Sequence, residues 1–419
     1  MNEKITYYQN RFIFNLLVGS AESEDFFLAT KDGSLDSLIK KIEINYLHQF
    51  FLNFISKNKI EECMEDENFN KLKNEALLLS VRNLKLHEIA RKISHEFDIN
   101  DIKFSILKGL SISKIIYEDI SFRTMRDLDV LVDLNDLEKA ILLLKKFGFY
   151  FPSKPDGDFK IIHSEDAYDL PRLIDSNGLI IEVHFSILGD YRNECALTNE
   201  ILRNKNNFSI DGIKINAPSL EENFAHLLYH GTSKEILGSG LIFISDLYKI
   251  LESKNFDIAN AIKIIKNNSL ENELRFYLDI LDYFNINNLN SRSLADCIEA
   301  KSMSKDLLVE AIRLLFSQVG VSHKRLLKIK KFKNEKNLIT KLEQLRNMLF
   351  PSKKKLSREF GETIDKSNFL KIYIKFFNRS FKELGKHVMN ELKKIGKKQN
   401  HEFLVYTKID NYFQNQDAS

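Results

Sequence analysis

Two aspartates one residue apart, Asp127 and Asp129, open an apolar run that ends at Val132. Asp is disfavoured in strands, so a pair at the start of a β-branched run indicates a special role. On a strand, side chains two residues apart point to the same face, which directs both carboxylates toward one place. Two carboxylates in one place repel each other unless a cation lies between them, and Mg²⁺ is the usual cation for hard oxygen ligands beside phosphate. The spacing therefore predicts a metal site at the start of the strand 127–132.

A third acidic residue lies inside another apolar run. Glu182 stands between Ile181 and Val183, where a charge is costly unless it is paired or bound to a metal. His184 follows two residues later and, on a strand, faces the same way as Glu182. A histidine there can orient a carboxylate, contact the substrate or act as a base. A strand with one solvated polar face is the alternative interpretation.

The order of these residues resembles a known family. Lys108-Gly109, followed by the pattern Arg-x-x-x-Asp-x-Asp-x-Leu-Val over residues 123–132, is similar to the bacterial "uncharacterised nucleotidyltransferase" family. That family is a branch of the DNA polymerase β-like nucleotidyltransferase superfamily. Its specific motifs fall within residues 108–184, and a weaker likeness extends to the Phe-Pro-Ser stretch at 350–352.

The resemblance implies a role for each of these positions. Superfamily members place a glycine-containing turn and an Asp-x-Asp strand around two metal ions and the phosphates of a nucleoside triphosphate. Here Asp127 and Asp129 would hold both Mg²⁺ ions, and Glu182 would be the third carboxylate. Lys108 and Arg123 would stabilise charge on the triphosphate, as phosphoryl-transfer chemistry requires.

The phosphate turn would include Gly109, since glycine lets a triphosphate approach the backbone and a following helix N-terminus favours anions. The superfamily usually has a second small residue directly after this glycine. Leu110 holds that place here, and Ser111 comes one position later. Ser111 and Arg126, the latter at a more variable position of the family, are further candidate nucleotide contacts.

A second polar group lies in the C-terminal part. His226 and His230 are four residues apart, a helical spacing that can ligate metal, but no third ligand of suitable spacing accompanies them. The family carries a similar histidine and a similar aspartate there, the latter at Asp246. For His230 and Asp246, hydrogen bonding that supports the site or joins two domains is favoured over substrate contact.

Hydrophobic periodicity indicates helices, then strands alternating with helices, then helices again, which predicts an α+β fold with an α/β-type core. Together with the family resemblance, this divides the chain into an N-terminal helical segment (1–99), a small mixed-sheet nucleotidyltransferase core (100–217) and an all-helical C-terminal domain (218–419). In the first part, one helix is predicted from a cap at Ser34 to Ile55, and another over 72–95. In the core, strands are predicted at 104–107, 127–132, 159–163, 168–174 and 179–188, with a hairpin at 210–215. Caps are predicted at Asp133 or Asn135 and at Ser219, and a helix stop at Gly148.

Composition limits the class of protein. With 43% hydrophobic and 29% charged residues, the chain is typical of a soluble globular protein. A net charge of +3 is too small to indicate binding of long nucleic acid. The three cysteines are far apart and read as reduced thiols. The first residues lack a signal-peptide pattern and no apolar run approaches the roughly 20 residues of a membrane span, so a cytoplasmic protein is expected.

Other motif classes find no support. The sequence has no Gly-x-x-x-x-Gly-Lys-Ser/Thr, no Gly-x-Ser-x-Gly and no paired Cys-x-x-Cys, which argues against a P-loop ATPase, a serine hydrolase and a zinc ribbon. The basic segment 322–336 is read as a solvated helix face. The apolar segment 369–377 is read as buried packing rather than as a membrane-surface helix.

The sequence thus predicts a metal-dependent nucleotidyltransferase. It would move a nucleoside monophosphate from a nucleoside triphosphate to a small-molecule or peptide acceptor and release pyrophosphate, with two Mg²⁺ ions as cofactor. An RNA end stays open as acceptor. Two alternatives remain: kinase-like phosphoryl transfer at the same site, and a non-catalytic nucleotide-binding or scaffold protein of a biosynthetic pathway. The preferred triphosphate and the oligomeric state cannot be read from the sequence.

Overall fold

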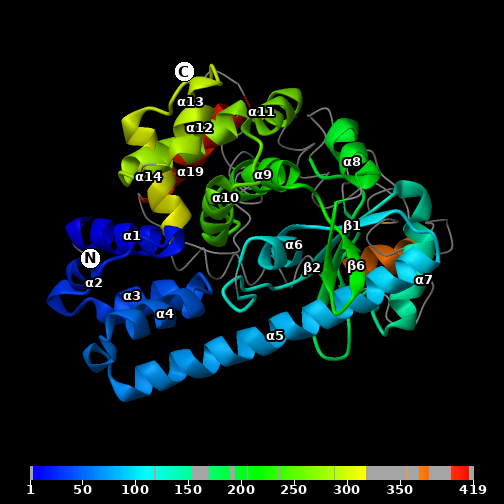
Figure 1. Cartoon of the computed structure of the whole chain (residues 1–419), viewed down its shortest axis with the longest axis horizontal. Helices are drawn as coiled ribbons and strands as arrows, with labels where there is room; N and C mark the ends of the chain where they lie inside the picture. Colours follow the sequence, from blue (N-terminus) through cyan, green and yellow to red (C-terminus); the bar gives the residue numbers. More distant parts are fainter. Residues whose placement is uncertain are drawn as a thin grey trace.

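A computed structural model describes residues 3–117, 119–152, 169–188, 194–204, 206–234, 236–286, 288–317, 356, 368–376 and 398–414 (Figure 1). The strands are β1 (Phe104–Ile106), β2 (Leu128–Val132), β3 (Leu173–Ile174), β4 (Ile180–His184), β5 (Asn207–Ile210) and β6 (Ile213–Asn216). The helices of the first half are α1 (Glu3–Val18), α2 (Ser23–Ala29), α3 (Leu35–Ile44), α4 (His48–Asn58), α5 (Asp66–Ile99), α6 (Lys108–Ile115), α7 (Leu137–Lys146) and α8 (Glu194–Arg203). The helices of the second half are α9 (Leu220–Tyr229), α10 (Ile242–Glu252), α11 (Ile258–Asn267), α12 (Glu271–Tyr283), α13 (Leu289–Asp296), α14 (Lys305–Ser317) and α19 (Lys398–Phe413). Among the described residues, no helix combines the length and the apolar character that crossing a bilayer requires.

The centre of the fold is a small mixed sheet with the strand order β1-β2-β4-β3. β2 runs antiparallel to β1 and parallel to β4, and β3 is antiparallel to β4. Strands β5 and β6 form a separate hairpin that turns at Asp211 and Gly212, both of which have positive φ. The predicted α+β class and the predicted hairpin are therefore confirmed.

The two faces of the four-stranded sheet differ in chemistry. One face is apolar and packs with α5 and α7 in a core that includes Ile106, Val130 and Val183. The other face carries Asp129 and His184 together with Leu131. Leu131 belongs to a second core, which it shares with the N-terminal helices α1–α4 and the C-terminal helices, here called the helical half. Because side chains alternate along a strand, Asp129, Leu131 and His184 all face the helices that follow the sheet in sequence.

One long helix connects the two halves of the molecule. The N-terminal half of α5 packs against α4, where His48 Nε2 lies 2.9 Å from Glu75 Oε2. Its C-terminal half contributes Ala90, Ile93 and Phe97 to the apolar core of the sheet. Figure 1 shows α5 running beneath both halves. The N-terminal helices α1 to α4 share the other core with the C-terminal helices, so the boundary predicted near residue 99 stays a prediction.

The predicted helix from Ser34 to Ile55 is wrong as a single helix. The chain breaks between α3 and α4 at Tyr46, whose φ of 56° no α-helix accommodates. Ser34 begins α3, but its hydroxyl does not cap that helix and lies 2.8 Å from the carbonyl oxygen of Ala29 instead. The second predicted helix is confirmed and is longer, as α5.

The predicted stop at Gly148 and the predicted cap at Ser219 are confirmed, whereas the predicted cap of α7 at Asp133 or Asn135 is wrong. Gly148, with a φ of 85°, follows the end of α7. Asp133 Oδ1 accepts a hydrogen bond from the backbone of Asn135 at 3.0 Å and so caps the short 3-10 turn Leu134–Asp136, and α7 begins after Asp136 without a side-chain cap. Ser219 and Glu222 form a reciprocal capping box at the start of α9, with distances of 3.1 and 2.7 Å.

Several strands are shorter than predicted. β2 begins at Leu128, so Asp127 directly precedes it. The strand predicted at 168–174 is reduced to β3 and one isolated bridge between Asp169 and His184. The strand predicted at 179–188 ends at His184, because the backbone N–H of Ile187 turns to Thr198 Oγ1 at 3.1 Å.

Some predictions fall elsewhere. The strand predicted at 159–163, the basic segment 322–336 and the Phe-Pro-Ser stretch at 350–352 lie outside the described residues. In the apolar segment 369–377, Ile372 and Phe376 are buried against Leu356, while Leu370 and Ile374 are exposed. Packing therefore takes up one side of this segment.

Candidate active site

The candidate site is centred on Asp129, which is 6% exposed. Its Oδ1 atom lies 2.8 Å from Lys108 Nζ and 2.8 Å from His184 Nε2. Glu182 is the register partner of Asp129 on the parallel strand β4, and its Oε2 atom lies 3.8 Å from His184 Nε2. Strand alternation thus brings residues from three separate stretches of sequence to one place.

Negative charge is in excess there. Burial raises the pKa of Asp127 to about 6, together with the charges of Asp129 and Glu182. Burial would also raise the pKa of Asp129, but the neighbouring Lys108 and His184 outweigh it and hold that pKa well below its ordinary value. Burial opposes the charge of Lys108, yet the carboxylates, Asp129 first, raise its pKa. Asp129 is therefore ionised, whereas burial and the two neighbouring carboxylates disfavour the charge of Asp127 more than Lys108 and Arg126 favour it.

The donor set fits a divalent cation. Asp129, Glu182 and His184 offer ligand atoms within 4.8 Å of one another. In the described part of the chain, no other group of three such side chains comes together in this way. Carboxylate oxygens suit Mg²⁺, and the crowding that raises the pKa of Asp127 is what a bound cation would relieve.

The backbone at the first residue of α6 is unusual. Lys108 adopts a φ of 47°, which is uncommon for a residue with a side chain and costs about 1 kcal/mol or more. At the next position, a Cβ on Gly109 would lie 2.9 Å from Met125 Cγ and 3.6 Å from Arg123 Nη1. Only glycine fits this contact between α6 and the loop before Asp127.

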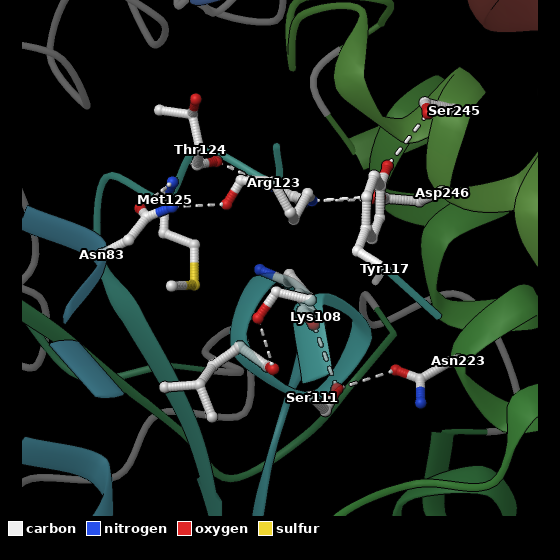
Figure 2. A network of polar contacts seen from close by, with 12 residues as sticks. Asn83, Lys108, Ser111, Tyr117, Arg123, Thr124, Met125, Asn223, Ser245 and Asp246 are labelled. Atoms are coloured by element: carbon white, nitrogen blue, oxygen red, sulfur yellow. Dashed lines mark hydrogen bonds and ion pairs between the residues drawn. The ribbon is translucent and has the colours of Figure 1, made fainter. Parts of the chain in front are cut away.

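That loop is held by a residue which the sequence reading missed. Asn83, on α5, donates to the carbonyl oxygens of Ile120 and Arg123 at 2.9 and 3.0 Å and accepts from the backbone of Met125 at 3.0 Å. Figure 2 shows Asn83 beside Met125 and Thr124. An asparagine in a long helix carries no signal of this role in the sequence, because its partners lie about forty positions away.

Arg123 has partners of its own in the protein (Figure 2). Its Nε–H lies 2.9 Å from both carboxylate oxygens of Asp246 on α10, and its Nη1 donates to the Thr124 carbonyl at 2.7 Å. The Tyr117 hydroxyl lies 2.9 Å from Asp246 Oδ1 and 3.0 Å from Ser245 Oγ. This buried cluster joins the loop before the sheet to the helical half.

Two other predicted nucleotide contacts, Ser111 and Arg126, have their nearest partners outside the carboxylate group. Ser111 is fully buried, and its hydroxyl lies 3.0 Å from the Lys108 carbonyl and 3.4 Å from Asn223 Oδ1. Arg126 is exposed, with its guanidinium 6.0 Å from the centre of the Tyr46 ring. Nucleotide contact by Arg123, Ser111 and Arg126 stays a prediction.

A further cation touches the site. Arg172 Nε lies 2.5 Å from Glu182 Oε1, and the arginine side chain is 64% exposed. A signal for it existed in the sequence: the turn at Asp175–Gly178 sets the register in which Leu173 faces Ile181, and Arg172 is therefore opposite Glu182.

The helical half presents a row of basic side chains near the site. Burial, then the charges of Lys108 and His184, holds the pKa of His226 well below its ordinary value, and its Nδ1 atom has no hydrogen-bond partner. Burial likewise lowers the pKa of His230 and of Lys234, whose charge interacts with Asp129 and Lys108. Residues 230–234 form a π-helical turn (η4, His230–Lys234), a feature often found at functional sites. The four-residue spacing of His226, His230 and Lys234 was a signal for Lys234 as well.

Comparison with known proteins identifies the family of the chain. Residues 32–284, more than half of the chain, match a protein family described as uncharacterised nucleotidyltransferase. None of the curated proteins matches the chain. Among solved structures, the chain is similar to the crystal structure of an antigenic nucleotidyltransferase-like protein from Paracoccidioides brasiliensis, with 14% identity, 53% of this chain and 95% of that chain covered, and a TM-score of 0.29. The resemblance predicted from the motifs is confirmed by the family match: the chain belongs to the uncharacterised nucleotidyltransferase family.

Proposed function

We propose that this protein transfers a nucleoside monophosphate from a nucleoside triphosphate to a small-molecule or peptide acceptor and releases pyrophosphate. The observation that carries the proposal is the placement of Asp129 beside Glu182 on parallel strands, with Asp127 adjacent and Lys108 on Asp129. Membership of a nucleotidyltransferase family supports nucleotidyl transfer in general. The donor, the acceptor and the metal are parts of the proposal.

Mg²⁺ is the proposed cofactor, held as two ions by Asp127, Asp129 and Glu182. When bound, such ions neutralise charge on the triphosphate and make the attacking oxygen a better nucleophile. The donor set supports this assignment, since carboxylates predominate in it and their mutual repulsion is not balanced by Lys108 alone. His184 orients Asp129 through its hydrogen bond and keeps the second carboxylate oxygen available.

The protein's own side chains would divide the remaining work. Glu182 is the proposed acceptor of the proton that the attacking group loses. Arg172 is the proposed mobile cation: its exposed ion pair with Glu182 contributes little stability, so the guanidinium is able to turn to a phosphate. Lys108, whose ammonium lies 2.8 Å from Asp129 Oδ1, would neutralise the triphosphate from the other side.

The first test is calorimetric titration of Mg²⁺ with each of the four nucleoside triphosphates. Wild type is compared with the Asp127→Ala/Asp129→Ala variant, and with Asp306→Ala as a control at an exposed aspartate on α14. We expect metal-dependent binding to wild type and to the control, and none to the double variant. Binding that survives in the double variant would place the nucleotide elsewhere and refute the assignment.

The second test identifies the group that moves. The protein is incubated with the bound triphosphate and a pool of small molecules and peptides, and the products are weighed by mass spectrometry. An acceptor heavier by a nucleoside monophosphate, with pyrophosphate released, supports the proposal. An acceptor heavier by one phosphate indicates kinase-like transfer, and binding without turnover indicates a non-catalytic nucleotide-binding protein.

A further inference from the structure

A cavity lies apart from the carboxylate site. It has a volume of about 720 Å³ and is lined by residues of α1, α2, α4, the loop that follows α6, and α10. None of Asp127, Asp129, Glu182 and His184 lines it. Its volume falls in the range of about 300–1,000 Å³ that is usual for pockets which bind small molecules.

One wall of this cavity is aromatic. Phe50 packs edge-on against Phe122, with ring centroids 5.6 Å apart, and against Tyr117, with centroids 6.4 Å apart. Leu16 and Leu17 of α1 extend the apolar wall. A flat apolar group would therefore find aromatic rings on one side of it, a contact worth more than its buried area alone.

Two lysines supply the charge. The Lys249 ammonium lies 5.2 Å from the centre of the Tyr117 ring, and Lys57 is exposed at the end of α4. Within the described part of the chain, neither lysine has a carboxylate in ion-pair distance. The acidic residues of the lining, Glu22 and Asp119, are both exposed, and Asp119 Oδ1 already accepts a hydrogen bond from the backbone of Ser121 at 2.7 Å. The cavity thus offers two ammonium groups, neither of them in an ion pair with any described carboxylate, beside an aromatic wall.

We propose that this cavity is a binding site for a small organic anion with an apolar, preferably aromatic, body. The body lies against the wall formed by Phe50, Tyr117 and Phe122, and the anionic group, a carboxylate, sulfonate or phosphate, lies between Lys249 and Lys57. A cationic ligand is disfavoured, because the ammonium of Lys249 already occupies the face of Tyr117. This inference does not depend on the proposed nucleotidyl transfer.

The test uses a pair of fluorescent probes. 8-Anilinonaphthalene-1-sulfonate is an aromatic anion, and N-phenyl-1-naphthylamine is its neutral counterpart. Both are titrated into wild type, into Lys57→Met/Lys249→Met, which removes the charges and keeps the stems, and into Asn53→Trp, which puts a bulky ring at an exposed position of the lining. Matched controls at exposed positions outside the lining are Lys40→Met/Lys263→Met and Asn70→Trp, and a thermal melt verifies that each variant is folded.

We expect one saturable site for the anion in wild type and in both controls. Its affinity should fall at least tenfold in Lys57→Met/Lys249→Met, while the neutral probe changes less than twofold, and both probes should be lost in Asn53→Trp. Equal affinity of the anion in wild type and in folded Lys57→Met/Lys249→Met, or unchanged binding in Asn53→Trp, would overturn the proposal. Displacement of the anion by a nucleoside triphosphate with Mg²⁺ in wild type, but not in the Asp127→Ala/Asp129→Ala variant, would also overturn it, because the probe would then occupy the carboxylate site.

Discussion

Two buried ion pairs lie near the sheet and differ in balance. In one, Arg123 meets Asp246 and Tyr117, and every strong charge has its partner inside the cluster. In the other, Lys108 and His184 meet Asp129 and the exposed Arg172 meets Glu182, while Asp127 adds a third carboxylate whose pKa is raised by burial and by its two acidic neighbours. The charges of the first cluster are paired by buried side chains, whereas the second cluster gathers three carboxylates whose repulsion a bound cation would relieve.

This difference predicts that substitutions in the first cluster affect stability and that substitutions in the second affect ligand binding. A balanced buried pair is strongly destabilised when one member is removed, since the other is left buried and unpaired. A site with surplus charge tolerates the loss of one carboxylate, because its neighbours still serve Lys108, but it loses the ligand that the surplus attracts. The two clusters should therefore respond in opposite ways to the same kind of substitution.

The largest expected effect is on activity at the surplus site. Asp129→Asn should lower nucleotidyl transfer by at least about a thousandfold, equivalent to about 4 kcal/mol of transition-state stabilisation. This loss is measured by steady-state kinetics, with the triphosphate and the acceptor that the two tests proposed above identify. The melting temperature should change far less than in the Asp246 variant below, because Asp127 and Glu182 remain near Lys108. A variant that unfolds as readily as the Asp246 variant would remove the distinction between the clusters.

The next effect is on stability at the balanced pair. Asp246→Leu leaves Arg123 and Tyr117 without their shared partner and should cost about 3–5 kcal/mol in urea unfolding. Arg123→Met/Asp246→Leu should recover at least half of that loss, since no buried charge is left alone. If the folded double variant also loses triphosphate binding, Arg123 contacts the nucleotide as the motif predicts. If binding persists, its role is to hold the loop.

A smaller effect concerns the contact beneath the phosphate turn. Gly109→Ala should destabilise the fold by about 1–3 kcal/mol, because the new methyl group overlaps Met125. The same substitution in a Met125→Ala background should cost almost nothing. A double-mutant cycle by chemical unfolding gives the coupling. Equal costs in both backgrounds would mean that the strain lies in the backbone and not in the methionine.

The smallest effect is a pH dependence at a neutral buried contact. His87 on α5 lies 3.2 Å from Ser113 Oγ, and burial, with the charge of Lys114, lowers its pKa to about 4. Between pH 6.5 and 4 the unfolded chain binds a proton that the folded chain does not, so this contribution to stability falls as pH falls. Discounted for partial screening, His87 should account for about 1 kcal/mol between pH 7 and pH 5.

Comparing the unfolding free energies of wild type and His87→Gln at the two pH values isolates this share from that of His226 and His230. Parallel losses in the two proteins would show that His87 has an ordinary pKa in the folded state.

Local pattern was sufficient for the sheet's chemistry. A period of two placed Asp129 on one face of its strand, and the same period aligned Glu182 with His184, because alternation needs no information from outside the strand. The hairpin at Asp211 and Gly212 was equally local, since both residues favour the positive φ of a tight turn. Only the family resemblance indicated that Glu182 belongs with the two aspartates, and the parallel register that places it opposite Asp129 was not predicted.

Contacts between distant residues were beyond the sequence. Arg123 and Asp246 are 123 positions apart, and nothing in either stretch states that they meet. The break at Tyr46 and the left-handed conformation of Lys108 are imposed by packing on residues that do not favour them. Arg172 and Lys234 were overlooked although turn register and helical spacing indicated them.

The long helix α5 also determines how the protein divides. With 34 residues it is roughly 50 Å long, and its two halves belong to different cores. A fragment that begins at residue 100 would leave the apolar face of the sheet uncovered, and one that ends at Ile99 would expose Ala90, Ile93 and Phe97. A cut between the sheet and the N-terminal helices therefore does not give two fragments that fold independently. We expect the intact chain to unfold in one cooperative step, because α5 belongs to both cores and its loss from one would destabilise the other.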